Sequence, residues 1–137
     1  MRVFVDTSSL FKKYLDEPGS DTFEKVLTKA TEIAISPVTW IEIHAAIERS
    51  VRNRSLPMEQ AEQLRMEVKK DFAYFWCTLW NENLEEKAIE IIHKHALKTL
   101  DSVQLASAVL SESELFVTSD QKLYQEAKKI VKHVQFI

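Results

Sequence analysis

The chain has 137 residues, of which 45% are hydrophobic and 28% charged, a balance that excludes a disordered chain. Its net charge of −3 excludes a protein that coats nucleic acid through broad positive charge, but not a nuclease whose acids are gathered in a metal site. The single cysteine, Cys77, excludes an internal disulfide framework and a cysteine zinc site, and fits a reducing cytoplasm. We therefore expect one cytoplasmic domain over residues 1–137, with no signal peptide and no membrane span.

Short β-branched and aromatic runs alternate along the chain with longer helical periods, which predicts an α/β fold with a mainly parallel sheet. In chain order the pattern predicts a strand at 3–5, helices at 10–15 and 22–30, a strand at 32–35, a helix that begins at Ser36-Pro37, a helix at 57–71, a strand at 75–80, a helix at 84–96, a helix from Asp101, a strand at 115–118, a helix at 121–130 and a strand at 133–137. The five aromatic side chains between 72 and 80 are expected mostly in the core: Phe72, Tyr74, Phe75, Trp76 and Trp80.

Four acids stand where this architecture would bring distant segments together. Asp6 follows the first strand, Glu42 lies in the first turns of the helix after the second strand, Asp101 begins a helix, and Asp120 follows the fourth strand. In open parallel sheets the carboxyl ends of the strands share one edge, and ligands bind there. The sequence therefore predicts an acidic site at that edge.

Each acid also has a structural interpretation as a helix cap. Asp6 or Ser8 could cap the first helix, and Asp120 could cap the helix that follows it. Thr39 with Glu42, and Asp101 with Gln104, have the spacing of a capping box.

The position around the helix predicts different environments for Asp101 and Glu42. It places Asp101 on the packed side of its helix with Leu105 and Ala108, but places Glu42 opposite the apolar stripe of Trp40, Ile43, Ile47 and Val51, where periodicity alone leaves it in solvent.

If all four acids converge, they must be protonated, widely spread or compensated by a cation, because clustered like charges disfavour ionisation. Oxygen-only ligands favour a hard ion such as Mg²⁺ or Mn²⁺. Such an ion bridges carboxylates and phosphate oxygens and lowers the pKa of a bound water, which suits hydrolysis of a phosphodiester. Ser8, Thr118 and Ser119 could hydrogen-bond water or phosphate nearby, or simply bond the backbone.

Four segments, in this order, resemble the PIN domain, and among PIN domains the VapC-like toxins of prokaryotic toxin–antitoxin pairs: VFVDTSSL, SPVTWIEIHAAI, LKTLDSVQLASAVL and LFVTSDQKL. The resemblance implies a three-layer α/β/α sandwich with a central parallel sheet of about five strands. It also implies a Mg²⁺- or Mn²⁺-dependent endoribonuclease, with Asp6, Glu42, Asp101 and Asp120 at the positions of the family's acids and Thr118 at its hydroxyl position. A homodimer and an antitoxin protein partner lying over the acidic groove are further implications.

The chain departs from the family pattern after the last acid. Many relatives carry another acid or Asn there, whereas this chain has Gln121, Lys122 and Leu123, which leaves a second metal ion without its usual ligand. Lys98 stands where some relatives have Arg before the third acid, and could contact a phosphate.

Other interpretations of the same residues remain open. His44 or His93 could act as a general base, although neither falls in a matching motif. The basic run Arg49, Arg52 and Arg54 could guide RNA, or it could be a solvated helix end. The fold could also serve as a non-catalytic PIN-like module that binds RNA or protein. A haloacid-dehalogenase-like phosphatase would need a second Asp where Ser8 stands, so that class is disfavoured.

Overall fold

The structure, a computed structural model, describes residues 1–137. Its strands are β1 (Arg2–Val5), β2 (Glu32–Ile35), β3 (Trp76–Cys77), β4 (Leu115–Thr118) and β5 (Val134–Phe136). Its helices are α1 (Thr7–Leu10), the 3-10 turn η1 (Phe11–Lys13), α2 (Ser20–Leu27), α3 (Thr39–Arg52), α4 (Met58–Phe72), α5 (Glu82–His95), α6 (Thr99–Leu110) and α7 (Gln121–Ala127).

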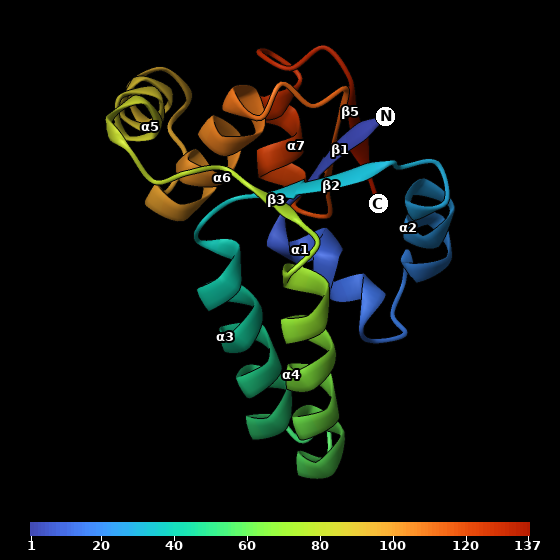
Figure 1. Cartoon of the computed structure of the whole chain (residues 1–137). Helices are drawn as coiled ribbons and strands as arrows, with labels where there is room; N and C mark the ends of the chain where they lie inside the picture. Colours follow the sequence, from blue (N-terminus) through green and yellow to red (C-terminus); the bar gives the residue numbers. More distant parts are fainter.

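The five strands form one all-parallel sheet in the order β3-β2-β1-β4-β5 (Figure 1). The central strand β1 pairs with β2 on one side and β4 on the other, with Phe4 opposite both Ala34 and Phe116. Val3, Phe4 and Val5 are fully buried, because both faces of a parallel sheet are covered and its strands are apolar throughout. The predicted parallel sheet of about five strands is confirmed.

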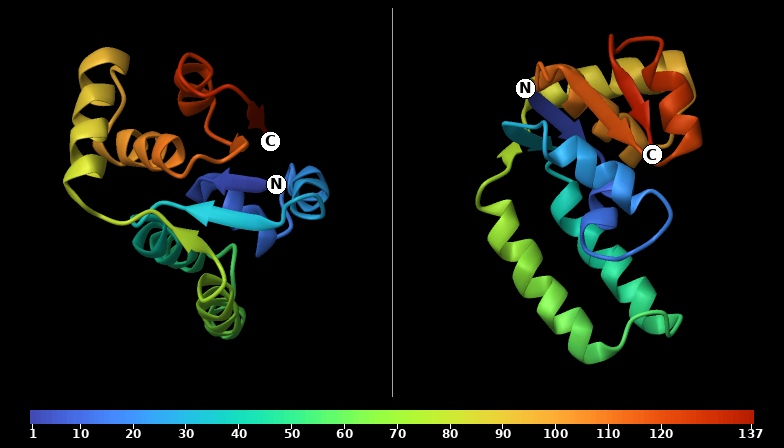
Figure 2. Two further views of the ribbon diagram at one scale, coloured as in Figure 1. Left: turned by 45° about the horizontal axis from the view of Figure 1, so that its top comes forward. Right: turned by 90° about the vertical axis from the view of Figure 1, so that its right-hand side faces the viewer.

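Helices cover both faces of the sheet and produce two hydrophobic cores. Val3 and Val5 point to the face that α1, η1, α2, α3 and α4 cover, whereas Phe4 and Phe116 point to the face that α5, α6 and α7 cover. Figure 2 shows α3 and α4 extending side by side away from the sheet on one face. The molecule is therefore the three-layer α/β/α sandwich that the sequence predicts. No helix combines the length and the apolar character that a membrane crossing requires.

Several predicted element boundaries are wrong, for local reasons. The first helix begins at Thr7 rather than at residue 10 because Asp6 caps it, and it gives way to a 3-10 turn at Phe11. The helix predicted from Ser36-Pro37 begins at Thr39, because Ser36 forms a turn before it by accepting from the Val38 and Thr39 amides.

The strand predicted at 75–80 is reduced to two residues, Trp76 and Cys77, which pair with the end of β2. The prediction that the neighbouring aromatic side chains lie mostly in the core is wrong for Tyr74 and Trp80. Tyr74 is 88% exposed and Trp80 is 55% exposed, because the chain leaves the sheet on either side of this short edge strand. Phe72 and Phe75 are partly buried and pack against the first core.

Candidate active site at the carboxyl edge of the sheet

All four acids named from the sequence line one cavity of about 460 Å³ at the carboxyl ends of β1 and β4. Asp6 follows β1, Asp120 follows β4, and Glu42 and Asp101 stand in the first turns of α3 and α6. The cavity wall also includes Thr7, Ser8, Phe11, Arg49, Asn53, Leu100 and Gln104. The fold therefore gathers side chains that lie up to 114 positions apart, from Asp6 to Asp120, on one surface.

Asp6 is the most buried of the four acids and is held at both of its oxygens. It is 3% exposed, and Ser8 Oγ donates to both carboxylate oxygens, at 2.8 and 2.9 Å. Thr118 Oγ1 donates to Oδ2 at 2.7 Å, and the Ser9 amide donates to Oδ1 at 3.0 Å. Burial, with a smaller contribution from the negative charge of Asp120, raises the pKa of Asp6 to about 6 against the opposing effect of these hydrogen bonds. This carboxyl is therefore poised to take up a proton or a cation.

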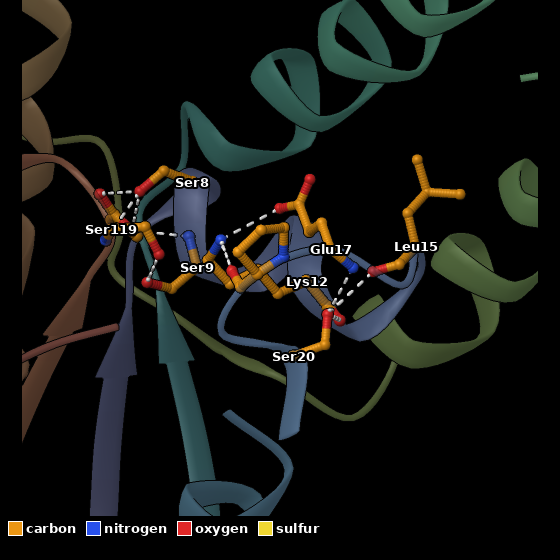
Figure 3. Close-up of polar contacts among 9 residues, drawn as sticks. Ser8, Ser9, Lys12, Leu15, Glu17, Ser20 and Ser119 are labelled. Carbon is orange, nitrogen blue, oxygen red and sulfur yellow. Dashed lines mark hydrogen bonds and ion pairs between the residues drawn. The ribbon is translucent and has the colours of Figure 1, made fainter. Parts of the chain in front are cut away.

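Ser8 and Ser9 join the first acidic loop to the loop that carries Asp120. The Ser119 amide donates to Ser8 Oγ at 3.1 Å, and the Ser9 and Ser119 hydroxyls are 2.8 Å apart (Figure 3). The Asp120 amide in turn donates to Thr118 Oγ1 at 3.0 Å. These bonds fix the separation of Asp6 and Asp120 through backbone amides and short hydroxyl side chains rather than through long flexible ones.

Asp120 and Asp101 keep carboxylate oxygens free of protein partners. Asp120 caps α7 by accepting from the Leu123 amide at 2.8 Å through Oδ1, which leaves Oδ2 unengaged. Asp101 is half-buried and accepts no hydrogen bond from the protein. Burial raises the pKa of Asp101, the charges of Asp120 and Glu42 raise it further, and Lys98 and Lys122 oppose the rise. Mutual repulsion among the acids is therefore part of the electrostatics of this cavity.

Glu42 corrects the expectation from helical phase, which placed it in solvent. Its side chain is partly buried, because Gln104 Nε2 donates to Oε1 at 2.7 Å and Thr7 Oγ1 donates to the same oxygen at 3.0 Å. The capping box proposed for Thr39 and Glu42 is also wrong, since Val38 is the N-cap residue and Thr39 Oγ1 accepts from Gln104 instead.

The second proposed capping box, Asp101 with Gln104, does not form either. Helix α6 begins at Thr99 with Lys98 as its N-cap, and Gln104 faces Glu42 rather than the start of its own helix. Thr7, Thr39 and Gln104 are thus site residues that the sequence reasoning missed. The available signal was a large polar residue, Gln104, among the small and apolar residues of the central part of α6.

The two histidines considered as general bases do not line the cavity. His44 packs edge-on against Trp40, with ring centroids 4.6 Å apart, and its Nε2 atom is buried without a hydrogen-bond partner. His93 is exposed near the end of α5. The cavity offers carboxylate, hydroxyl and amide oxygens as its ligands.

These donors fit a hard divalent cation that retains part of its water shell. No three His, Cys, Asp or Glu side chains converge as a ready-made metal group, so the acids line the cavity without meeting at one point. Mg²⁺ commonly uses only one or two protein carboxylates and keeps several waters. The free oxygens of Asp101, Asp120 and Glu42, and the raised pKa of buried Asp6, suit that form of coordination.

The structure defines an α/β/α protein with an all-parallel sheet and an acidic cavity at the carboxyl edge of that sheet. Among known protein families, the model of the PIN domain matches residues 3–129 of this chain. The chain belongs to the PIN domain family.

Among curated relatives, Ribonuclease VapC45 and Ribonuclease VapC49 of Mycobacterium tuberculosis are each 26% identical over 111 residues, which cover 78% of this chain and 74% of the relative. Solved structures share the fold at lower identity. FitAcB from Neisseria gonorrhoeae has a TM-score of 0.72 at 14% identity and covers 98% of this chain and 96% of its own. A toxin–antitoxin complex from Klebsiella pneumoniae has a TM-score of 0.66 at 20% identity and covers 89% of each chain.

Proposed function

We propose that this protein is a metal-dependent endoribonuclease that hydrolyses RNA phosphodiester bonds with Mg²⁺ or Mn²⁺. One observation carries the proposal: the four acids at the family's motif positions line a single cavity, and three of them keep unpaired oxygens there. The relatives named as ribonucleases support RNA as the substrate.

The acids divide the work according to how each is held. Asp6 is fixed by Ser8, Thr118 and the Ser9 amide, so it provides a rigid negative charge at the floor of the cavity. Asp101 and Asp120 have oxygens without protein partners, and together with Asp6 they would hold the cation directly or through water. A bound divalent ion supplies positive charge that offsets these carboxylates and stabilises charge developing on the phosphate.

Glu42 would orient the attacking water. Gln104 and Thr7 hold its Oε1 atom, and Oε2 is left to accept a hydrogen bond from that water or to join the cation. Attack of water at phosphorus, with departure of the 3′ oxygen, leaves a 5′-phosphate and a 3′-hydroxyl on the products. The absence of an acid at Gln121, Lys122 or Leu123 favours one principal ion over two.

The direct test is incubation of purified protein with single-stranded RNA and Mn²⁺, with and without EDTA, followed by mass analysis of the product ends. We expect cleavage by the wild type, none after Asp6→Asn, and full cleavage by the matched control Asp16→Asn, which changes an exposed acid outside the cavity. Equal cleavage by Asp6→Asn and the wild type would contradict the assignment. RNA binding by the wild type without cleavage would instead favour a non-catalytic module.

We further propose that the protein is the toxin of a type II toxin–antitoxin pair and acts as a homodimer. The Klebsiella pneumoniae structure, which shares the fold, is a toxin–antitoxin complex. The exposed side chains of Tyr74, Leu79 and Trp80 beside the edge strand β3 provide an apolar surface for a second subunit. Light scattering during size exclusion would measure the mass of the particle, and expression with and without the adjacent reading frame would test growth inhibition and its relief.

A further inference from the structure

Gln104 forms the centre of a buried polar network between two walls of the cavity. Gln104 is 2% exposed and lies in the central part of α6, which is buried from Ser102 to Ala108. Its Nε2 atom is 2.7 Å from Glu42 Oε1 and 3.0 Å from both Thr7 Oγ1 and Thr39 Oγ1. Three elements, α1, α3 and α6, therefore meet at a single amide nitrogen.

The hydrogen bonds in this network point toward Glu42. The Gln104 amide carries two hydrogens, and the shortest contact is the one to the Glu42 carboxylate, as expected for a charge-assisted bond. The Thr7 hydroxyl also donates to Glu42 Oε1, at 3.0 Å. Turning the Gln104 amide over would bring its carbonyl oxygen against the carboxylate, so the charge of Glu42 determines the orientation of the amide.

That orientation leaves the other end of the amide unpaired. Gln104 Oε1 is buried without a hydrogen-bond partner, which reduces stability relative to an apolar side chain of the same size. A residue selected for packing alone would be Leu or Met at this position, among the apolar neighbours of α6. The glutamine is therefore explained by its contact with Glu42 and not by the stability of the core.

From these contacts we infer that Gln104 is a positioning residue, which holds Glu42 by one oxygen and leaves the other for the cation or the attacking water. The inference rests on the nuclease function proposed above and adds a residue to it. Because Asp101 stands three residues earlier in the same helix, the Gln104–Glu42 bond also sets the separation of the two acids across the cavity. Partners that orient a metal ligand in this way typically contribute about 10–100-fold to metal affinity or activity.

The experiment compares Gln104→Met, which removes the donor at nearly constant volume, with Gln104→Glu, which places a carboxylate against Glu42. Gln63→Met is the control, because Gln63 is exposed on α4 and outside the cavity. Each protein is measured for kcat and KM on RNA, for the Mn²⁺ concentration that half-saturates binding in calorimetry, and for its melting temperature without metal. A second set carries the same substitutions in the Glu42→Gln background.

For Gln104→Met we expect kcat or Mn²⁺ affinity to fall by about 10–100-fold, with KM nearly unchanged and a melting temperature equal to the wild type or higher. Gln104→Glu should lower kcat or Mn²⁺ affinity further. In the Glu42→Gln background, Gln104→Met should cause no additional loss of activity or Mn²⁺ affinity. A wild-type level of activity and Mn²⁺ binding in Gln104→Met would overturn the inference while leaving the nuclease proposal intact. A wild type that neither binds Mn²⁺ nor cleaves RNA would overturn both.

Discussion

Replacing the buried Asp6 by Asn should make the metal-free protein more stable at neutral pH, even though it abolishes activity. Asn is as good an N-cap as Asp, so the cap of α1 is kept. The substitution removes a buried carboxyl group whose pKa is raised from 3.8 to about 6, mainly by desolvation. That rise corresponds to roughly 3 kcal/mol of stability that the wild type lacks once Asp6 is ionised.

The sign of the pH dependence follows from the direction of this shift. The folded protein keeps the Asp6 proton up to a higher pH than the unfolded chain does, so the stability from this group is fully present below pH 3.8 and is lost as the pH rises through about 6. The advantage of Asp6→Asn over the wild type should therefore be up to roughly 3 kcal/mol at about pH 8 and about half of that at about pH 5.

Guanidinium unfolding in EDTA at both pH values measures these differences, with Asp16→Asn as the control for the loss of an exposed charge. Mn²⁺ at about 1,000 times its Kd and about pH 8 should reverse the order, since it stabilises only the protein that binds it, by about 4.1 kcal/mol. If Asp6→Asn is less stable than the wild type by the same amount at both pH values, Asp6 is a structural hydrogen-bonding residue and the charge argument is refuted.

Two further substitutions test the hydrogen bonds that hold the acids and the positive charge that would attract RNA to the cavity. Thr118→Val removes a donor that lowers the pKa of Asp6 and leaves the Asp120 amide without its acceptor. The unfolding free energy should therefore fall by about 1–3 kcal/mol, and calorimetry should show weaker Mn²⁺ binding. Unchanged values of both quantities would contradict this prediction. Arg49 lines the cavity and has no acidic partner, whereas Arg52 pairs with Glu48. Arg49→Ala should reduce the slope of log binding constant against log salt concentration for RNA, measured by anisotropy, by about 1. An equal effect of Arg52→Ala would contradict a specific role for Arg49.

The fold could be predicted largely from apolar runs because both faces of a parallel sheet are covered. Strands β2 and β4 have the predicted ends, since each is a short apolar run that stops at a polar residue. The same reasoning failed at β3, where aromatic residues have high strand propensity but only Trp76 and Cys77 reach a partner strand. Propensity describes the residue, whereas pairing depends on where the neighbouring strand ends.

The position of the acidic cavity was predictable, but capping a helix and lining the cavity are not alternative roles for these acids. Asp6 and Asp120 cap α1 and α7 and also line the cavity. A carboxylate has two oxygens and about four acceptor positions, so one bond to a helix amide leaves most of its capacity free. Capping also fixes the rotamer, and a capped acid is therefore better suited to a site than a free one.

Glu42 could not be placed from its own helix because the side chain that holds it comes from elsewhere. Helical phase compared Glu42 with the apolar stripe from Trp40 to Val51, which lies opposite it. The buried face of α3 also includes Thr39 and Ala46, which flank Glu42 on the helix. Its partner Gln104 is 62 positions further along the chain and reaches it only after α6 has packed on the opposite face of the sheet. With an apolar residue at 104, Glu42 would lose its strongest tether and only the bond from Thr7 would keep it from the solvent position that phase predicts.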